Sequence, residues 1–208
     1  MKIQFIGFAA TANNTLAIPA HKAGDTIIML AFTPGVFVIP LTPGGEWVAL
    51  ASNSSSTATR EYGALLAYKV ALSDAETSGT WASTAALMCL VYRGARAVAP
   101  IRNNFMSATA GYSGAYSYAA IPTFYQPNKS SWAVSVVANG TNTATVNSPP
   151  AGMTLRGTSS NSECAFGAQD TNGPVTGWAG GSGANSIAGV NINYAFELRA
   201  AARVSVCG

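Results

Sequence analysis

Residues 190–198, Val-Asn-Ile-Asn-Tyr-Ala-Phe-Glu-Leu, alternate apolar and polar side chains more regularly than any other part of the chain. A period of two residues is typical of a β-strand, because successive side chains point to opposite faces of the sheet. The apolar side chains that we expect to face the core are Ile192, Tyr194, Phe196 and Leu198. The polar side chains that we expect to face outward are Asn191, Asn193 and Glu197.

A second kind of strand is indicated by residues 26–32, Thr-Ile-Ile-Met-Leu-Ala-Phe, which form a continuous apolar run after the turn residues Gly24 and Asp25. A run without alternation predicts a strand that is buried on both faces, at the centre of a sheet. Residues 86–92 and 131–137 are similar.

Shorter strands are expected at further apolar or alternating runs between turn residues, namely 3–8, 36–39, 46–50, 61–72, 144–146, 153–156 and 164–168, with 203–207 as a candidate last strand or free end. For residues 61–72 a helix is the alternative, because Ala and Leu are good helix formers. Residues 51–60 are expected to form a loop.

About ten to twelve strands without a convincing helix indicate an all-β fold, a two-sheet antiparallel sandwich of jelly-roll-like type, although other Greek-key orders give the same pattern. We expect a single domain over residues 1–208, with residues 200–208 as a candidate tail. In the second half, residues 103–130 and 157–189 are rich in Gly, Ser and Asn and predict long loops.

Charged residues make up only 9% of the 208 residues, against about 25% in an ordinary soluble domain. The net charge of +3 is spread along the chain and no run of Lys or Arg occurs, which argues against nucleic-acid binding. No run approaches the roughly 20 apolar residues of a membrane span, and the apolar start of the chain is too short for a secretory signal. We therefore expect no membrane association and synthesis in the cytoplasm.

Catalytic and metal-binding patterns are weak, so no catalytic residue, metal ligand or cofactor is assigned. His21 is the sole histidine; a triad with Asp25 is conceivable, but the chain has no Gly-x-Ser-x-Gly motif. The eight acidic residues single out no glycosidase pair, and residues 169–173 suggest a plain turn more than a calcium loop. Cys89 is expected in the core, and Cys207 is a reduced thiol or an interchain partner.

Aromatic side chains among small residues of the second half are the best functional signal. The candidates for contact with a partner protein or a sugar are Tyr112, Tyr116, Tyr118, Phe124, Tyr125 and Trp178. Exposed together they would be an aggregation hazard, so we expect neighbouring subunits or a particle surface to cover them. The alternative is that these rings fill the ends of the sandwich.

The first half carries a resemblance to a known group of proteins. Its segments are Ala-His-Lys-Ala-Gly-Asp-Thr-Ile-Ile (20–28), Pro-Gly-Gly-Glu-Trp (43–47), Leu-Leu-Ala-Tyr-Lys-Val-Ala (65–71), Glu-Thr-Ser-Gly-Thr-Trp (76–81) and Val-Tyr-Arg-Gly (91–94). In this order they resemble small β-rich virion structural proteins of tailed bacteriophages, of the head-decoration or tail-associated type.

That resemblance implies a non-enzymatic protein located in the virion, most simply a capsid decoration or cement protein on the outer surface of the shell. The implied partners are the major capsid protein and other copies of the chain, with a trimer as the first expectation. The alternative function is a carbohydrate-binding or receptor-binding module of a tail appendage, with glycans as partners.

Overall fold

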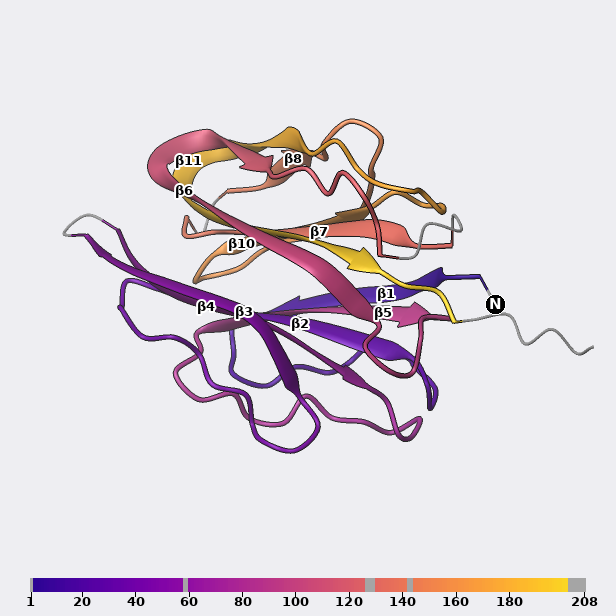
Figure 1. Cartoon of the computed structure of the whole chain (residues 1–208). Helices are drawn as coiled ribbons and strands as arrows, with labels where there is room; N and C mark the ends of the chain where they lie inside the picture. Colours follow the sequence, from indigo (N-terminus) through magenta and orange to yellow (C-terminus); the bar gives the residue numbers. More distant parts are fainter. Residues whose placement is uncertain (1, 58–59, 126–129, 142–143, 202–208) are drawn as a thin grey trace, which may run out of the picture.

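Eleven β-strands form the regular structure of this computed structural model, which describes residues 2–57, 60–125, 130–141 and 144–201 (Figure 1). They are β1 (Gln4–Thr11), β2 (Thr26–Pro34), β3 (Val48–Thr57), β4 (Arg60–Val70), β5 (Ala86–Arg93), β6 (Ile101–Tyr118), β7 (Trp132–Asn139), β8 (Val146–Ser148), β9 (Thr154–Ser160), β10 (Ala165–Asp170) and β11 (Gly181–Leu198). No helix occurs among these residues, and so none that could cross a membrane. The all-β expectation is confirmed.

The strands form two antiparallel sheets that face each other as a sandwich (Figure 1). The first sheet has the order β1-β5-β2-β4-β3, and the second has the order β6-β11-β7-β10-β9, with β8 paired to β11. Each sheet is drawn from one continuous half of the chain. The two-sheet sandwich is confirmed, whereas the jelly-roll order is not.

Strand β2 lies at the centre of the first sheet, paired with β4 on one side and β5 on the other. Every residue from Thr26 to Phe32 is buried, as the continuous apolar run predicts. Residues 60–70 form strand β4 rather than a helix, because pairing on both sides outweighs the helix propensity of Ala and Leu.

The main core lies between the sheets and takes alternate residues from the inner faces of both. Strand β11 contributes Ile192, Tyr194, Phe196 and Leu198, all fully or almost fully buried. The register predicted from the alternating sequence is therefore confirmed.

Both outer faces of the sandwich are also covered by the chain itself. On the first sheet, Trp81 packs with the outward side chains of β2, β4 and β5 in a second apolar cluster, which includes Met29, Leu65 and Val91. On the second sheet, strands β6 and β11 are each 18 residues long, curl together and return over the sheet beside β8 (Figure 1). A third apolar cluster fills the space beneath this returning part.

Much of the sequence expected to form long loops is strand. Residues 101–118 form β6, and residues 181–198 form β11, which pairs with it over most of its length. Ser, Gly and Ala have low strand propensity, but propensity in a sheet depends on the neighbouring strands more than on the residue alone. The short strands expected at 153–156 and 164–168 are confirmed, and they extend over residues 154–160 and 165–170.

In the first half, two expected segments differ from the structure. Residues 36–39 do not form a strand, and residues 51–57, expected as a loop, extend β3 to the end of its hairpin with β4. The candidate strand at 203–207 and Cys207 lie outside the described residues.

Several polar side chains that were expected to face solvent are buried instead. Asn191, Asn193 and Glu197 do lie on the outer face of β11, but the returning part of β6 and the following segment cover them. Asp170, expected in a turn, is buried at the end of β10. Lys69 on the outer face of β4 is likewise buried, beside the loop at 72–81. The alternation predicts which face a residue occupies, but not what covers that face.

Candidate functional site

Four of the six candidate aromatic side chains lie in the interior. Their exposed fractions lie between 1% and 8%, and they are Tyr116, Tyr118, Phe124 and Trp178. We call these four residues the aromatic cluster. They belong to the apolar cluster over the outer face of the second sheet, together with Ala133, Val137 and Ala195. The exposed aromatic surface expected for them is therefore absent, and the fold itself covers these rings.

The aromatic cluster is held by ring contacts and hydrogen bonds. Tyr118 lies 5.6 Å from Tyr116 and 5.8 Å from Trp178 between ring centroids. The Tyr118 hydroxyl accepts a hydrogen bond from Gln169 Nε2 at 2.6 Å, and burial raises the pKa of this phenol well above its ordinary value of 10. Gly183 lets the Tyr116 ring approach, since a Cβ there would lie 2.4 Å from ring atoms. Replacing Tyr116 and Trp178 would therefore disrupt the fold itself.

The other two aromatic candidates are placed differently. Tyr125 is 65% exposed, and its backbone N–H donates to Glu197 Oε2 at 2.8 Å. Tyr112 belongs to β6, but its side chain lies outside the described part of the structure. Tyr125 is therefore the candidate whose ring is shown to meet solvent.

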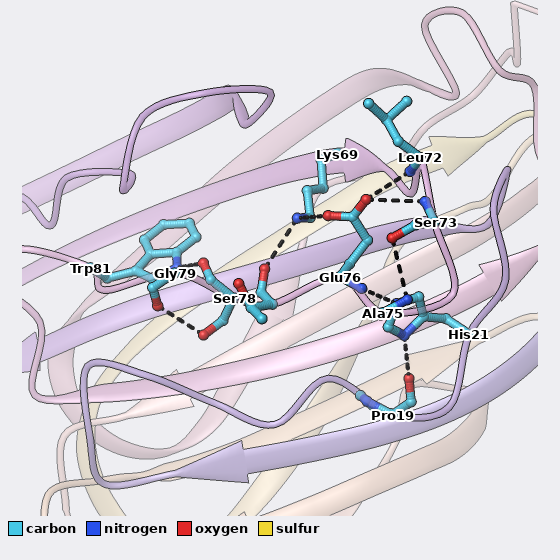
Figure 2. Close-up of polar contacts among 11 residues, drawn as sticks. Pro19, His21, Lys69, Leu72, Ser73, Ala75, Glu76, Ser78, Gly79 and Trp81 are labelled. Carbon is cyan, nitrogen blue, oxygen red and sulfur yellow. Dashed lines mark hydrogen bonds and ion pairs between the residues drawn. The ribbon is translucent and has the colours of Figure 1, made fainter.

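The single histidine joins two loops that cover the outer face of the first sheet (Figure 2). Nδ1 of His21 donates to the Pro19 carbonyl at 2.8 Å, and Nε2 accepts the backbone N–H of Glu76 at 3.0 Å. This pattern requires a neutral ring with its proton on Nδ1, since a carbonyl can only accept. Both ring nitrogens are thus occupied by backbone groups.

The carboxylate of Glu76 holds the same loop in place by accepting hydrogen bonds from three donors. Its carboxylate accepts Nζ of Lys69 at 2.5 Å and the backbone N–H groups of Leu72 and Ser73 (Figure 2). Lys69 also donates to the Thr77 carbonyl and lies 5.2 Å from the Trp47 ring centroid. The network fixes the loop and orients no nucleophile.

An open pocket of about 390 Å³ lies beside this network, lined by Thr15, Leu16, Ala17, Thr77, Ser78, Gly79 and Thr80. Ser78 Oγ accepts the Leu16 N–H at 2.9 Å and donates to the Gly79 carbonyl, so this hydroxyl is already engaged. None of the lining side chains titrates near neutral pH.

The triad considered for His21 is not assembled. Asp25 is buried and accepts both Arg93 Nε and Arg93 Nη2, together with the Lys22 N–H, and does not contact the histidine. In the weak calcium candidate at 169–173, Asp170 is paired with Arg156. Among the described residues, no three His, Cys, Asp or Glu side chains gather as a metal site.

Cys89 and Cys164 are buried free thiols, and burial raises the pKa of both well above the ordinary value. A thiol with a raised pKa is a poor nucleophile, because the thiolate is the reactive form. Cys89 is confirmed as a core residue.

Apolar side chains gather on the surface where a strand was expected. Residues 36–41, Val-Phe-Val-Ile-Pro-Leu, expose Phe37 by 54% and Leu41 by 59%, and we call this segment the apolar loop. No charged residue occurs between Asp25 and Glu46 on either side of it. Pro34-Gly35 and Pro40 could have signalled a loop, since proline interrupts strand pairing.

The backbone of the apolar loop packs directly against Gly63 of β4. A Cβ at Gly63 would lie 1.7 Å from the Val38 carbonyl oxygen. We expect Gly63→Ala to displace the loop and to lower the free energy of unfolding by about 1–3 kcal/mol, as overpacking does. Denaturant unfolding and limited proteolysis of the loop check this. Gly173→Ala is the control, since its Cβ would meet nothing closer than 3.9 Å. Equal stability of the two variants would contradict the packing.

The Glu76 network gives a pH-dependent prediction. The Lys69 ammonium and the backbone donors lower the pKa of Glu76 from its ordinary 4.5. The unfolded chain therefore binds a proton more readily, and the stabilisation is complete above about pH 4.5 and lost as the pH falls through the lower, folded pKa. Glu76→Gln should lower the free energy of unfolding by about 1.5–3 kcal/mol at pH 7. The difference from wild type should become progressively smaller as the pH falls.

Denaturant unfolding of wild type and Glu76→Gln between pH 7 and pH 2 checks this dependence. The exposed Glu46→Gln serves as the control and should follow wild type across the range. A constant difference between Glu76→Gln and wild type at all pH values would contradict the role of the carboxylate.

Comparisons of the chain with known protein families, with curated proteins and with solved structures found no match.

Proposed function

We propose that this chain is a non-enzymatic structural protein of a bacteriophage particle, which attaches to the outer surface of the capsid shell through the apolar loop. The observation that carries the proposal is the exposure of Phe37 and Leu41, together with their apolar neighbours, in one short segment. A contiguous exposed apolar segment favours a protein contact, whereas single exposed apolar residues are ordinary.

The energetics favour attachment at this segment. Full burial of a Val, Leu, Ile or Phe side chain contributes about 1.5–3 kcal/mol. Five such side chains within residues 36–41 are 36% to 59% exposed, so docking adds about half of that contribution for each. Because Gly63 holds the backbone of the loop against β4, less conformational entropy is lost on docking than with a free loop.

The phage assignment is supported by the resemblance of residues 20–94 to virion structural proteins and by the scarcity of charge, which lowers repulsion between crowded copies. The same scarcity supports a symmetric homo-oligomer, with a trimer as the first choice. Sedimentation equilibrium should then show a species larger than the monomer. A monomer at high micromolar concentration would contradict the oligomer.

Two experiments test the attachment. Mass spectrometry of purified mature particles should find the chain, and its absence would refute the proposal. Purified chain should co-sediment with particles that lack it, whereas Phe37→Asp should not. Val98→Asp is the matched control, since Val98 is 77% exposed and lies outside the apolar loop. Equal retention of both variants would show that the apolar loop is not the contact.

A carbohydrate-binding role remains the second candidate, supported by the exposed ring of Tyr125. The rings of the aromatic cluster are buried. Among the described candidate rings, the exposed Tyr125 therefore carries this role. Glycan-array binding that is lost in Tyr125→Ala, with the unfolding midpoint unchanged, would favour this role.

A further inference from the structure

Three arginines from separate segments meet at one end of the second sheet. Arg102 in β6 lies directly opposite Glu197 of β11, and Arg199 follows two residues later on the same outer face. The backbone N–H of Arg96, in the segment between β5 and β6, donates to the Arg199 carbonyl at 2.9 Å. The sequence gives no sign of this meeting, because Arg96 and Arg199 lie about a hundred positions apart.

Tyr125 lies between two of these arginines. Its ring centroid is 4.7 Å from Cζ of Arg199 and 5.6 Å from Cζ of Arg102, within cation–π range of both guanidinium groups. The ring remains largely exposed. We call Arg96, Arg102, Tyr125 and Arg199 the arginine patch.

Arg199 is the buried member of the arginine patch. It is only 4% exposed, and its Nη1 donates to the Ala99 carbonyl at 3.2 Å. Its Nε is buried and has no hydrogen-bond partner within the described part of the chain. A buried donor without an acceptor is costly, and more so on a charged group.

Within the described part of the chain, the charges that act on Arg199 are mainly positive. Burial lowers the pKa of Arg199 below its ordinary value, the charges of Arg96 and Arg102 lower it further, and Glu197 opposes them. The Glu197 carboxylate is itself engaged by Ser131 Oγ at 2.7 Å and by the Tyr125 N–H. Among the residues that the structure describes, these three cations thus share the carboxylate of Glu197, which also accepts hydrogen bonds from Ser131 and Tyr125.

We propose that the arginine patch is a binding site for an oxyanion, the carboxylate or phosphate group of a small ligand. Guanidinium groups present paired N–H donors that match such anions. Arg102 is exposed and Arg96 partly so, so these two guanidinium groups meet the anion from solvent, and the buried Arg199 adds its positive charge from within. The exposed Tyr125 ring offers an apolar surface to the rest of the ligand. This site is independent of the apolar loop and of attachment to a particle, and it shares Tyr125 with the carbohydrate-binding candidate.

The test is calorimetric titration of the full chain with inorganic phosphate, acetate and glucuronate, each at constant ionic strength set with sodium chloride. We expect saturable binding of at least one of these anions. Binding of phosphate alone identifies a phosphate ligand, whereas binding of acetate and glucuronate identifies a carboxylate. No saturable binding of any of the three would overturn the proposal.

Substitutions locate the binding. Arg102→Gln should weaken it about tenfold, the loss expected for one charge-assisted hydrogen bond. Lys22→Gln removes the same charge at another exposed position and should bind as wild type does. Because Arg102 is exposed, its replacement should leave the unfolding midpoint unchanged, and thermal unfolding followed by near-ultraviolet circular dichroism checks this. Equal binding by Arg102→Gln and wild type would place the anion elsewhere and overturn the assignment.

Discussion

Replacing Asp170 by asparagine is expected to lower the free energy of unfolding by about 3–5 kcal/mol, the cost of removing one partner from a buried ion pair. The Asp170 carboxylate is fully buried and accepts Arg156 Nε and Nη2, both at 2.8 Å. It also accepts the Tyr92 hydroxyl at 2.9 Å. Since Tyr92 belongs to β5 and Asp170 to β10, this group links the two sheets through the core.

Asparagine at this position would turn an N–H donor toward a guanidinium that needs an acceptor. Arg156 would be left largely buried, with Cζ 5.1 Å from the Phe5 ring centroid and no full counter-charge. Denaturant unfolding measures the effect, with the exposed Glu46→Gln as the control for loss of a carboxylate. The double variant Asp170→Leu/Arg156→Met should recover much of the loss, because it leaves no unpaired charge. A loss below about 1 kcal/mol in Asp170→Asn would contradict the role assigned to the pair.

Replacing Phe196 by alanine is expected to cost about 3–5 kcal/mol, since a large fully buried ring leaves a cavity that its neighbours fill only in part. Phe196 lies in the core between the two sheets, in the strand whose alternation predicts the fold. The register pairs it with Val134 of β7. The loss should therefore appear in the cooperative unfolding of the whole sandwich.

The control for this substitution is Phe37→Ala in the apolar loop, which removes the same atoms from a half-exposed position. Phe37→Ala should change the free energy of unfolding by less than about 1 kcal/mol. Denaturant unfolding measures both variants, and the two are compared with the same slope of the free energy of unfolding against denaturant concentration. Similar losses in the two variants would mean that β11 presents its opposite face to the core.

Sequence reasoning works best here where burial follows from local pattern. The alternation at 190–198 correctly assigns Tyr194 and Phe196 to the core, and the continuous run at 26–32 correctly predicts a central strand. Both inferences depend on strand geometry alone, which neighbouring residues of one segment determine.

It fails where a distant segment decides burial. Nothing near Glu197 or Asn193 in the sequence shows that β6 and β11 curl back and cover their face. The same return of the chain turns Tyr116 and Trp178 from candidate contact residues into interior ones. The arginine patch is missed for a related reason, because Arg96, Arg102 and Arg199 are brought together by strand pairing and not by spacing.

Hydrogen–deuterium exchange of the free chain and of the particle-attached chain tests together the interior position of the aromatic cluster and the attachment through the apolar loop. We expect the amides of residues 36–39 to gain protection on attachment. The amides of Tyr116, Tyr118 and Trp178 should be equally protected in both states, since the chain itself covers them. Unchanged exchange at 36–39, with protection gained at the aromatic cluster, would contradict both assignments.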